Sequence, residues 1–249
     1  MASPPTRIQL CGRLVVELEG RRVEGELSGR QGRTLFAYLV VHRLRLAGRG
    51  ELETLWGEIA PPAADASLSA LLSKLRAALG PGVLEGRREL RLLLPAGAWV
   101  DVEAAFEAIH RAESCVALGE WAGAWGPARV ALNVSNRPFL PGAVAPWIDE
   151  RRRALEGLRL RALECVAAAG LGLEGPELAA TERSARSLIE VAPFRESGYR
   201  FLMEALAARG EAAEALVVYD RLRRLLRDEL GIAPTRATQD LHRVLLACS

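Results

Sequence analysis

Serine, lysine and arginine side chains gather in one short stretch of the sequence, SLSALLSKLRAALG, from Ser67 to Gly80. Such side chains suit nucleic acid, because a hydroxyl can hydrogen-bond to a phosphate or a base edge and a cation can neutralise phosphate charge. At 100° per residue, leucines fall along one stripe of the expected helix and small residues fall opposite. The stripe is Leu68, Leu71, Leu72, Leu75 and Leu79, and the opposite face is Ala66, Ala70, Ser73 and Ala77. A face of small residues permits close approach to a partner surface.

Further basic residues lie on neighbouring segments. Arg87 and Arg88 fall at the tip of an expected hairpin, and Arg30 and Arg33 fall in the first turn of an expected helix, whose N-terminus also attracts anions. The predicted DNA-contacting residues are Arg30, Arg33, Ser67, Ser69, Ser73, Lys74, Arg76, Arg87 and Arg88. An ordinary amphipathic helix beside a charged hairpin tip is the alternative interpretation of this pattern.

Residues 1–100 have the element order of a winged helix. The segments RIQLCG and RLVVELEG predict short strands, and the alternation of Val16 and Leu18 with glutamates indicates one buried face. Three helices are expected next, followed by two strands around a turn at Gly86 to Arg88. In winged helices the third helix lies in the major groove and the hairpin touches the adjacent backbone.

Capping residues indicate where the helices of this region are expected to begin and end. Ser28 and Gln31 have the spacing of a capping box at the start of the first helix. The second helix is expected to end at Gly57, and Asp65 is the expected N-cap of the third. Gly80 and Pro81 end that third helix.

Residues 101–249 predict helices only. Gly175 and Gly210 each precede a helix and lie 35 positions apart, close to the tetratricopeptide period of about 34 residues. The predicted segments are Val102–Leu118, Glu120–Leu132, Ala145–Ala169, Pro176–Val191, Glu196–Arg209, Glu211–Leu230 and Thr235–Ala247. The expected fold is therefore an α+β N-terminal winged helix over 1–100, followed by an all-α tetratricopeptide-like helical repeat domain over 101–249.

No residue pattern predicts catalysis, a cofactor or a metal. The segment GLGLEG, Gly170 to Gly175, matches the dinucleotide motif, but a helix precedes it where that motif needs a strand, so a flexible link between helices is expected. The four cysteines are widely spaced and predict reduced thiols, and the three histidines have no ligand spacing. An enzyme is therefore disfavoured.

The charge distribution favours nucleic-acid binding, and the hydropathy disfavours a membrane span. Residues 1–100 carry 14 basic and 10 acidic side chains, whereas the remainder carries 19 basic and 21 acidic ones. A basic front half fits nucleic-acid binding. No apolar run is long enough to span a membrane, and the N-terminus MASPPTRIQL has no signal region, so a cytoplasmic location without a membrane partner is expected.

Several strings carry a family resemblance. LFAYLVVHR, ELETLWG and PPAADASLSALLSKLRAALG with the following hairpin resemble the response-regulator-type winged helix. FLPGAVAPWIDERRRALEGLRLRALE and the later segment containing RDELGIAP resemble the bacterial transcriptional activator domain. Together they resemble the Streptomyces antibiotic regulatory protein (SARP) family over nearly the whole chain.

This resemblance implies a transcription activator that binds double-stranded promoter DNA at direct repeats as side-by-side protomers. It also implies contact with RNA polymerase holoenzyme through the polymerase and its sigma factor. Two other hypotheses stay open. One is a protein-interaction module that uses the helical repeats beside a degenerate winged helix, and the other is a small-ligand receptor.

Overall fold

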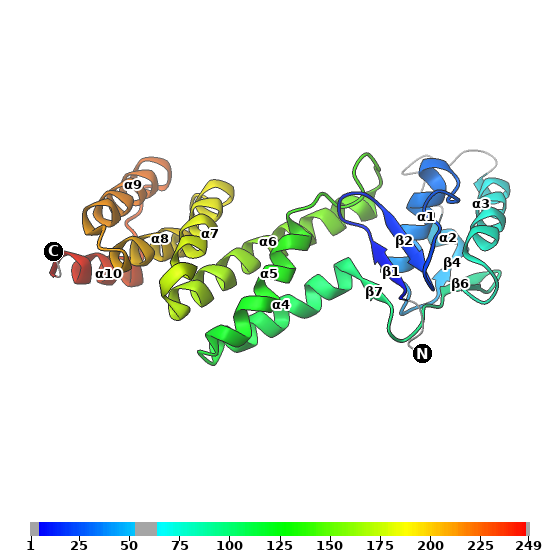
Figure 1. Cartoon of the computed structure of the whole chain (residues 1–249). Helices are drawn as coiled ribbons and strands as arrows, with labels where there is room; N and C mark the ends of the chain where they lie inside the picture. The colour runs from blue at the N-terminus through cyan, green and yellow to red at the C-terminus, as the bar shows by residue number, and fades with distance from the viewer. Residues whose placement is uncertain (1–4, 53–63, 248–249) are drawn as a thin grey trace. The chain divides into compact units, whose positions relative to one another are not determined.

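The computed structural model describes residues 5–52 and 64–247, which form two compact units (Figure 1). The first unit comprises Met1–Ala105 and Val134–Glu156, and the second comprises Phe106–Asn133 and Gly157–Ser249. The chain therefore leaves the first unit, returns to it and leaves again. The expected domain boundary near residue 100 stays a prediction.

A four-stranded sheet opens the first unit. Its strands are β1 (Arg7–Gln9), β2 (Val15–Leu18), β3 (Arg21–Arg22) and β7 (Trp99–Val100). Their order is β3-β2-β1-β7, with β7 parallel to β1 and the other pairs antiparallel. Val16 and Leu18 are buried, which confirms the predicted alternation. Strand β7 was not predicted, because it has two residues and pairs with β1, which lies far away along the chain.

Three helices and a second sheet complete the winged-helix order. They are α1 (Gly29–Val41), β4 (Ala47–Gly48), α2 (Arg49–Leu52), α3 (Ala64–Leu79), β5 (Leu84–Glu85) and β6 (Glu89–Leu92). The predicted hairpin is confirmed as β5 and β6. Strand β4, which was not predicted, pairs antiparallel with β6 and makes the wing part of a three-stranded sheet.

Two cap predictions are wrong. Ser28 occupies the N-cap position of α1, but its side chain makes no capping hydrogen bond, and Gln31 is exposed. The Gly32 N–H donates to the Ser28 backbone carbonyl instead, at 2.9 Å. Asp65 lies inside the first turn of α3, not before it, because the helix begins at Ala64. The predicted end of the second helix at Gly57 lies outside the described residues.

Helices fill the rest of the chain and confirm the predicted segments. They are α4 (Asp101–Ala117), α5 (Trp121–Ser135), α6 (Pro146–Leu173), the short 3-10 helix η2 (Gly175–Glu177), α7 (Leu178–Val191), α8 (Glu196–Ala208), α9 (Ala212–Leu230) and α10 (Arg236–Ala247). Helix α8 packs against both α7 and α9 (Figure 1). Tyr199, Leu202, Met203 and Leu206 of α8 are buried in the core that these helices share.

The predicted flexible link at GLGLEG is wrong for its first four residues. Helix α6 continues to Leu173, so Gly170 and Gly172 are helical. A Cβ on Gly170 would lie 2.5 Å from the Thr181 hydroxyl, and one on Gly172 would lie 2.4 Å from the Trp121 ring. These glycines are therefore needed for close packing against neighbouring helices.

One buried carboxylate joins the first strand to the start of α4. The Asp101 side chain is fully buried and accepts the backbone N–H groups of Leu10 at 3.0 Å and Cys11 at 2.9 Å. Burial raises the pKa of Asp101, while these hydrogen bonds oppose that shift. Burial likewise raises the pKa of the Cys11 thiol to about 12, which keeps it protonated and unreactive.

We expect Asp101→Ala to lower the free energy of unfolding by about 3 kcal/mol, because it removes the acceptor of three buried backbone N–H groups, those of Leu10, Cys11 and Val102. Urea denaturation followed by circular dichroism measures the change. Asp149→Ala is the matched control, since Asp149 is exposed and forms a surface ion pair with Arg152. Equal losses in both variants would contradict the role given to Asp101.

Candidate nucleic-acid interface

Helix α3 presents the face that the helical wheel predicts. Leu68, Leu72, Leu75 and Leu79 are all buried at 3% exposure or less, and the helix packs against α1. Leu71 is half-buried. The opposite face is exposed and consists of Ala66, Ser69, Ala70, Ser73, Lys74 and Ala77. Burial of the leucines thus fixes which small side chains point outward.

Arg49 positions α3 and the wing together. Its guanidinium forms an ion pair with Asp65 at 2.8 Å and donates to the Ser69 hydroxyl at 2.8 Å. Its backbone N–H donates to the Arg88 carbonyl at the wing turn, at 3.1 Å. Sequence reasoning missed Arg49, because its acidic partner lies sixteen positions away and no short motif links the two. The Ser69 hydroxyl therefore already has a partner within the chain.

Helix α2 is held against α1 by a polar group. The Tyr38 hydroxyl donates to the Glu51 carboxylate at 3.1 Å, and Arg45 forms an ion pair with the same carboxylate at 2.6 Å. The hydrogen bond from Arg45 lowers the pKa of Glu51, and burial raises the pKa of Tyr38. Glu51 therefore stays ionised at neutral pH and fixes the start of α2, where Arg49 lies.

The wing turn is tied to α3. The Arg76 guanidinium donates to the Gly86 carbonyl, so this side chain braces the turn. Arg87 and Arg88 are exposed at the tip. Gly86 has φ +88°, and a Cβ there would lie 1.8 Å from the Glu89 carbonyl oxygen. Only glycine fits this turn without displacing the backbone.

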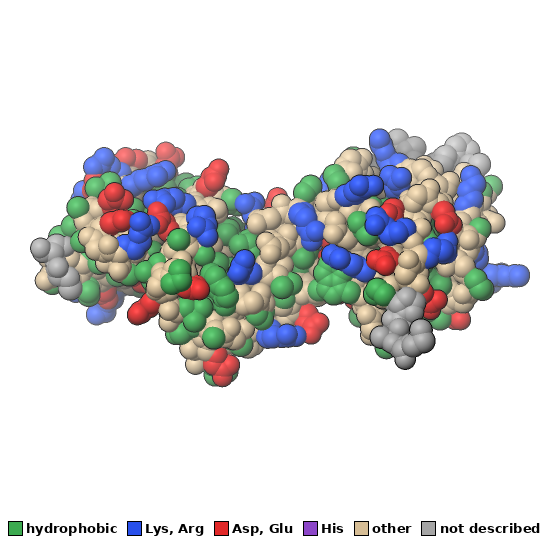
Figure 2. Space-filling view, viewed as in Figure 1, with side chains coloured by type: hydrophobic (Ala, Val, Ile, Leu, Met, Phe, Trp, Pro, Cys, Tyr) green, Lys and Arg blue, Asp and Glu red, His purple; other side chains and the backbone are tan. Residues whose placement is uncertain are grey.

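The charge on these elements is mixed. Exposed acidic side chains lie beside the basic ones, and Glu85 and Arg91 are paired positions on β5 and β6. Figure 2 shows red acidic side chains among the blue basic ones on the visible face of the first unit. The exposed charged residues of α3 and the wing are Asp65, Lys74, Glu85, Arg87, Arg88, Glu89 and Arg91. A phosphate backbone would therefore meet a modest positive surface.

Arg30 and Arg33 lie at a different place. Both are exposed on the first turns of α1 and line a cavity with Arg13 and the loop Leu140–Ala143. Within the described residues, none from α3 or the wing lines this cavity. The structure therefore brings Ser67, Ser73, Lys74, Arg76, Arg87 and Arg88 onto two adjoining elements, whereas Arg30 and Arg33 belong to another surface.

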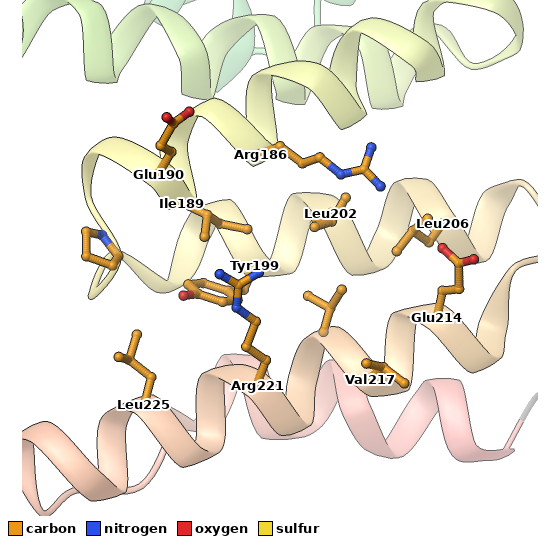
Figure 3. Close-up of a pocket in the computed structure, with 12 residues that line it drawn as sticks. Arg186, Ile189, Glu190, Tyr199, Leu202, Leu206, Glu214, Val217, Arg221 and Leu225 are labelled. Carbon is orange, nitrogen blue, oxygen red and sulfur yellow. The ribbon is translucent and has the colours of Figure 1, made fainter.

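The second unit has an apolar trough, shown in Figure 3. Helix α8 forms its floor with Tyr199, Leu202 and Leu206, and α7 and α9 form its walls. Its volume is about 730 Å³, and its lining residues are Arg186, Ile189, Glu190, Pro193, Tyr199, Leu202, Leu206, Glu214, Val217, Val218, Arg221 and Leu225. Val217 is 68% exposed in this apolar surface. Apolar side chains with charged residues at the edge are the chemistry of a groove that receives an amphipathic helix.

No cluster of three or more histidine, cysteine or acidic side chains that could bind a metal was found among residues 5–52 and 64–247. No helix in those ranges is both long and apolar enough to cross a membrane.

Comparison with known proteins identifies relatives. The family model described as the bacterial transcriptional activator domain matches residues 100–246. The regulatory protein AfsR of Streptomyces coelicolor is 36% identical over 220 residues, and AfsR of Streptomyces griseus is 31% identical over 217 residues. Each match covers 87% of this chain and 22% of the relative, so the chain spans less than a quarter of these proteins.

A solved structure shares the fold. Mycobacterium tuberculosis EmbR, in complex with a low-affinity phosphopeptide, has a TM-score of 0.80 and 24% sequence identity. The match covers 98% of this chain and 65% of that chain. The predicted fold class, a winged region followed by helical repeats, is thereby confirmed.

We expect Gly86→Ala to loosen the wing, since the new Cβ would overlap the Glu89 carbonyl and strain a positive φ. Hydrogen–deuterium exchange should show faster exchange of the amides in β5 and β6. Gly82→Ala is the control, because Gly82 has φ +78° but no atom within 4 Å of its Cβ position. An effect of Gly82→Ala as large as that of Gly86→Ala would show that the clash is unimportant.

Proposed function

Because the chain belongs to the SARP family of transcription regulators, with its bacterial transcriptional activator domain over residues 100–246, we propose that it binds promoter DNA through α3 and the wing and contacts RNA polymerase through its helical repeats. The observation that carries the DNA-binding part is the exposed small-residue face of α3, backed by buried leucines and adjoined by an arginine-tipped hairpin.

The proposed contacts differ in kind. Ser73 and Lys74 are exposed on α3, and Ser67 is half-buried there. These three residues would contact phosphates or base edges in the major groove, which is about 12 Å wide. Arg87 and Arg88 at the wing would contact the neighbouring backbone. Arg76 braces the wing, and Ser69 bonds to Arg49, so direct DNA contact by either requires a change of partner. Arg30 and Arg33 line a separate cavity, so the DNA contact predicted for them from the sequence stays untested and is not part of the proposed interface.

The apolar trough favours the second part of the proposal. Transcription activation requires a protein contact, and the trough is lined by apolar side chains that include the exposed Val217. Charged residues on both walls, Arg186 and Glu190 on α7 with Glu214 and Arg221 on α9, would orient an amphipathic helix of the polymerase holoenzyme. The same observation supports the alternative function, a protein-interaction module that acts without DNA.

Neither role needs catalytic chemistry. Members of a regulator family act through binding equilibria, and the proposal assigns no cofactor. Promoter binding by side-by-side protomers would place two copies of the α3 face on successive major grooves, as direct repeats one helical turn apart require.

We expect Ala70→Glu to weaken binding to DNA from the chain's own promoter by at least about tenfold, because it adds a bulky negative charge to the face that meets phosphates. Fluorescence anisotropy across a salt series measures the affinity. For the unaltered chain, the logarithm of the affinity should fall with the logarithm of salt by about 0.9 per neutralised phosphate.

The matched control is Ala213→Glu, which adds the same charge at an exposed position of α9 in the second unit. Its DNA affinity should equal that of the unaltered chain. Flat and negligible binding of the unaltered chain at low salt, or equal affinity of both variants, would rule out the α3 face as the DNA-binding surface.

We expect Val217→Glu to abolish binding to purified RNA polymerase holoenzyme, because it introduces a charge into the apolar trough without disturbing a buried position. Val244→Glu, on α10 and 58% exposed outside the trough, should bind normally. Surface plasmon resonance with immobilised holoenzyme compares the two. Binding by Val217→Glu at the level of Val244→Glu would place the polymerase contact elsewhere.

A further inference from the structure

A cavity of about 460 Å³ lies in the first unit, on the surface that Arg30 and Arg33 share. Its wall comes from the turn after β1, the first turns of α1 and the loop that precedes α6, which lie near one another in Figure 1. Its lining residues are Gly12, Arg13, Leu14, Gly29, Arg30, Arg33, Thr34, Leu140, Pro141, Gly142 and Ala143. The volume is within the range of small-molecule sites, about 300–1,000 Å³.

Three arginines give this cavity a positive field. Arg13, Arg30 and Arg33 line it from two separate segments, and no acidic residue does so within the described chain. Within that same part of the chain, none of the three guanidinium groups forms an ion pair or hydrogen bond with a carboxylate. Arg43 and Arg161, in contrast, each hold a glutamate through two hydrogen bonds. Unpaired cations around a concave surface attract an anion.

The cavity wall is fixed without a ligand. The Arg152 guanidinium donates to the carbonyls of Phe139, Leu140 and Ala143, which holds the loop in a tight curve. The Gly12 N–H donates to the Pro138 carbonyl at 2.8 Å, and so joins this loop to the turn after β1. A preformed site loses little freedom when a ligand binds.

We propose that this cavity binds the phosphoryl group of a small phosphorylated molecule through Arg13, Arg30 and Arg33. The planar guanidinium fork matches the geometry of phosphate oxygens. Several such forks together suit a doubly charged phosphoryl group better than they suit a singly charged carboxylate. The N–H groups of the first turn of α1, which the Ser28 side chain does not cap, add donors at the same place. The site stands independently of the proposed DNA contacts of α3.

Two sources of phosphate fit this chemistry, a free phosphorylated molecule and the DNA backbone. The geometry favours the free molecule, because the site is concave and shares no lining residue with α3 or the wing in the described ranges. The experiment therefore uses inorganic phosphate and pyrophosphate as probes in one arm and promoter DNA in the other.

Isothermal titration calorimetry of the full chain at constant ionic strength should show saturable pyrophosphate binding and weaker phosphate binding. Arg30→Ala with Arg33→Ala, and separately Arg13→Ala on the other segment, should each weaken pyrophosphate binding by at least about tenfold, because each removes charge-assisted hydrogen bonds. Arg183→Ala, which removes an exposed arginine of α7, is the control and should leave binding unchanged.

The absence of saturable binding, or equal binding by all variants, would overturn the proposal. In the DNA arm, the Arg30→Ala and Arg33→Ala double variant should keep the affinity and salt slope of the unaltered chain. A smaller salt slope with unaltered pyrophosphate binding would assign these arginines to the DNA backbone and overturn the small-molecule site. The Ala70→Glu variant, tested for DNA binding alone, separates a failure of the proposed function from a failure of this site.

Discussion

Burial of the α3 leucine stripe is the constraint on which the candidate interface depends. Leu68, Leu72, Leu75 and Leu79 are each at most 3% exposed, and burial of a leucine side chain contributes about 2 kcal/mol. No contact available to the small side chains of the opposite face has a comparable magnitude. The rotation of α3 about its axis is therefore set by the core, and Ala70, Ser73 and Lys74 face outward as a consequence.

Arginine supplies the polar contacts that a leucine core cannot. Arg49 joins α2, α3 and the wing turn, and Arg76 joins α3 to Gly86. A guanidinium can reach two acceptors at once, as that of Arg49 does with Asp65 and Ser69 of α3. Lys74, the sole lysine in the sequence, has no such forked geometry and is exposed. The basic residues near the interface thus divide into those that position its elements and those that remain available to a partner.

The sequence predicted what periodicity and turn residues can carry, namely the helices after Asp101, the α3 stripe and the wing turn at Gly86. It did not predict β4 and β7, because each has only two residues and pairs with a strand far along the chain, whereas the equally short β5 pairs with β6 across a recognisable turn. Asp101 and Arg49 escaped notice for the same reason, since their hydrogen-bond partners are distant in sequence. The helical glycines of GLGLEG resemble a linker in composition and reveal their packing role only when Trp121 and Thr181 lie against them.

The sparse charge of the α3 face bears on how a promoter would be recognised. With Lys74, Arg87, Arg88 and Arg91 as the exposed cations of α3 and the wing, and Asp65, Glu85 and Glu89 exposed beside them, one copy would neutralise few phosphates and release few counterions. Two copies on one DNA would convert the second binding step into a local one, so the combined affinity would exceed that of either alone. If the proposed DNA binding holds, a direct-repeat site occupied by side-by-side protomers would suit this surface better than a single half-site. A wing fixed by Gly86 and Arg76 would also raise the combined affinity for DNA, since a preordered contact loses less entropy on binding in each copy.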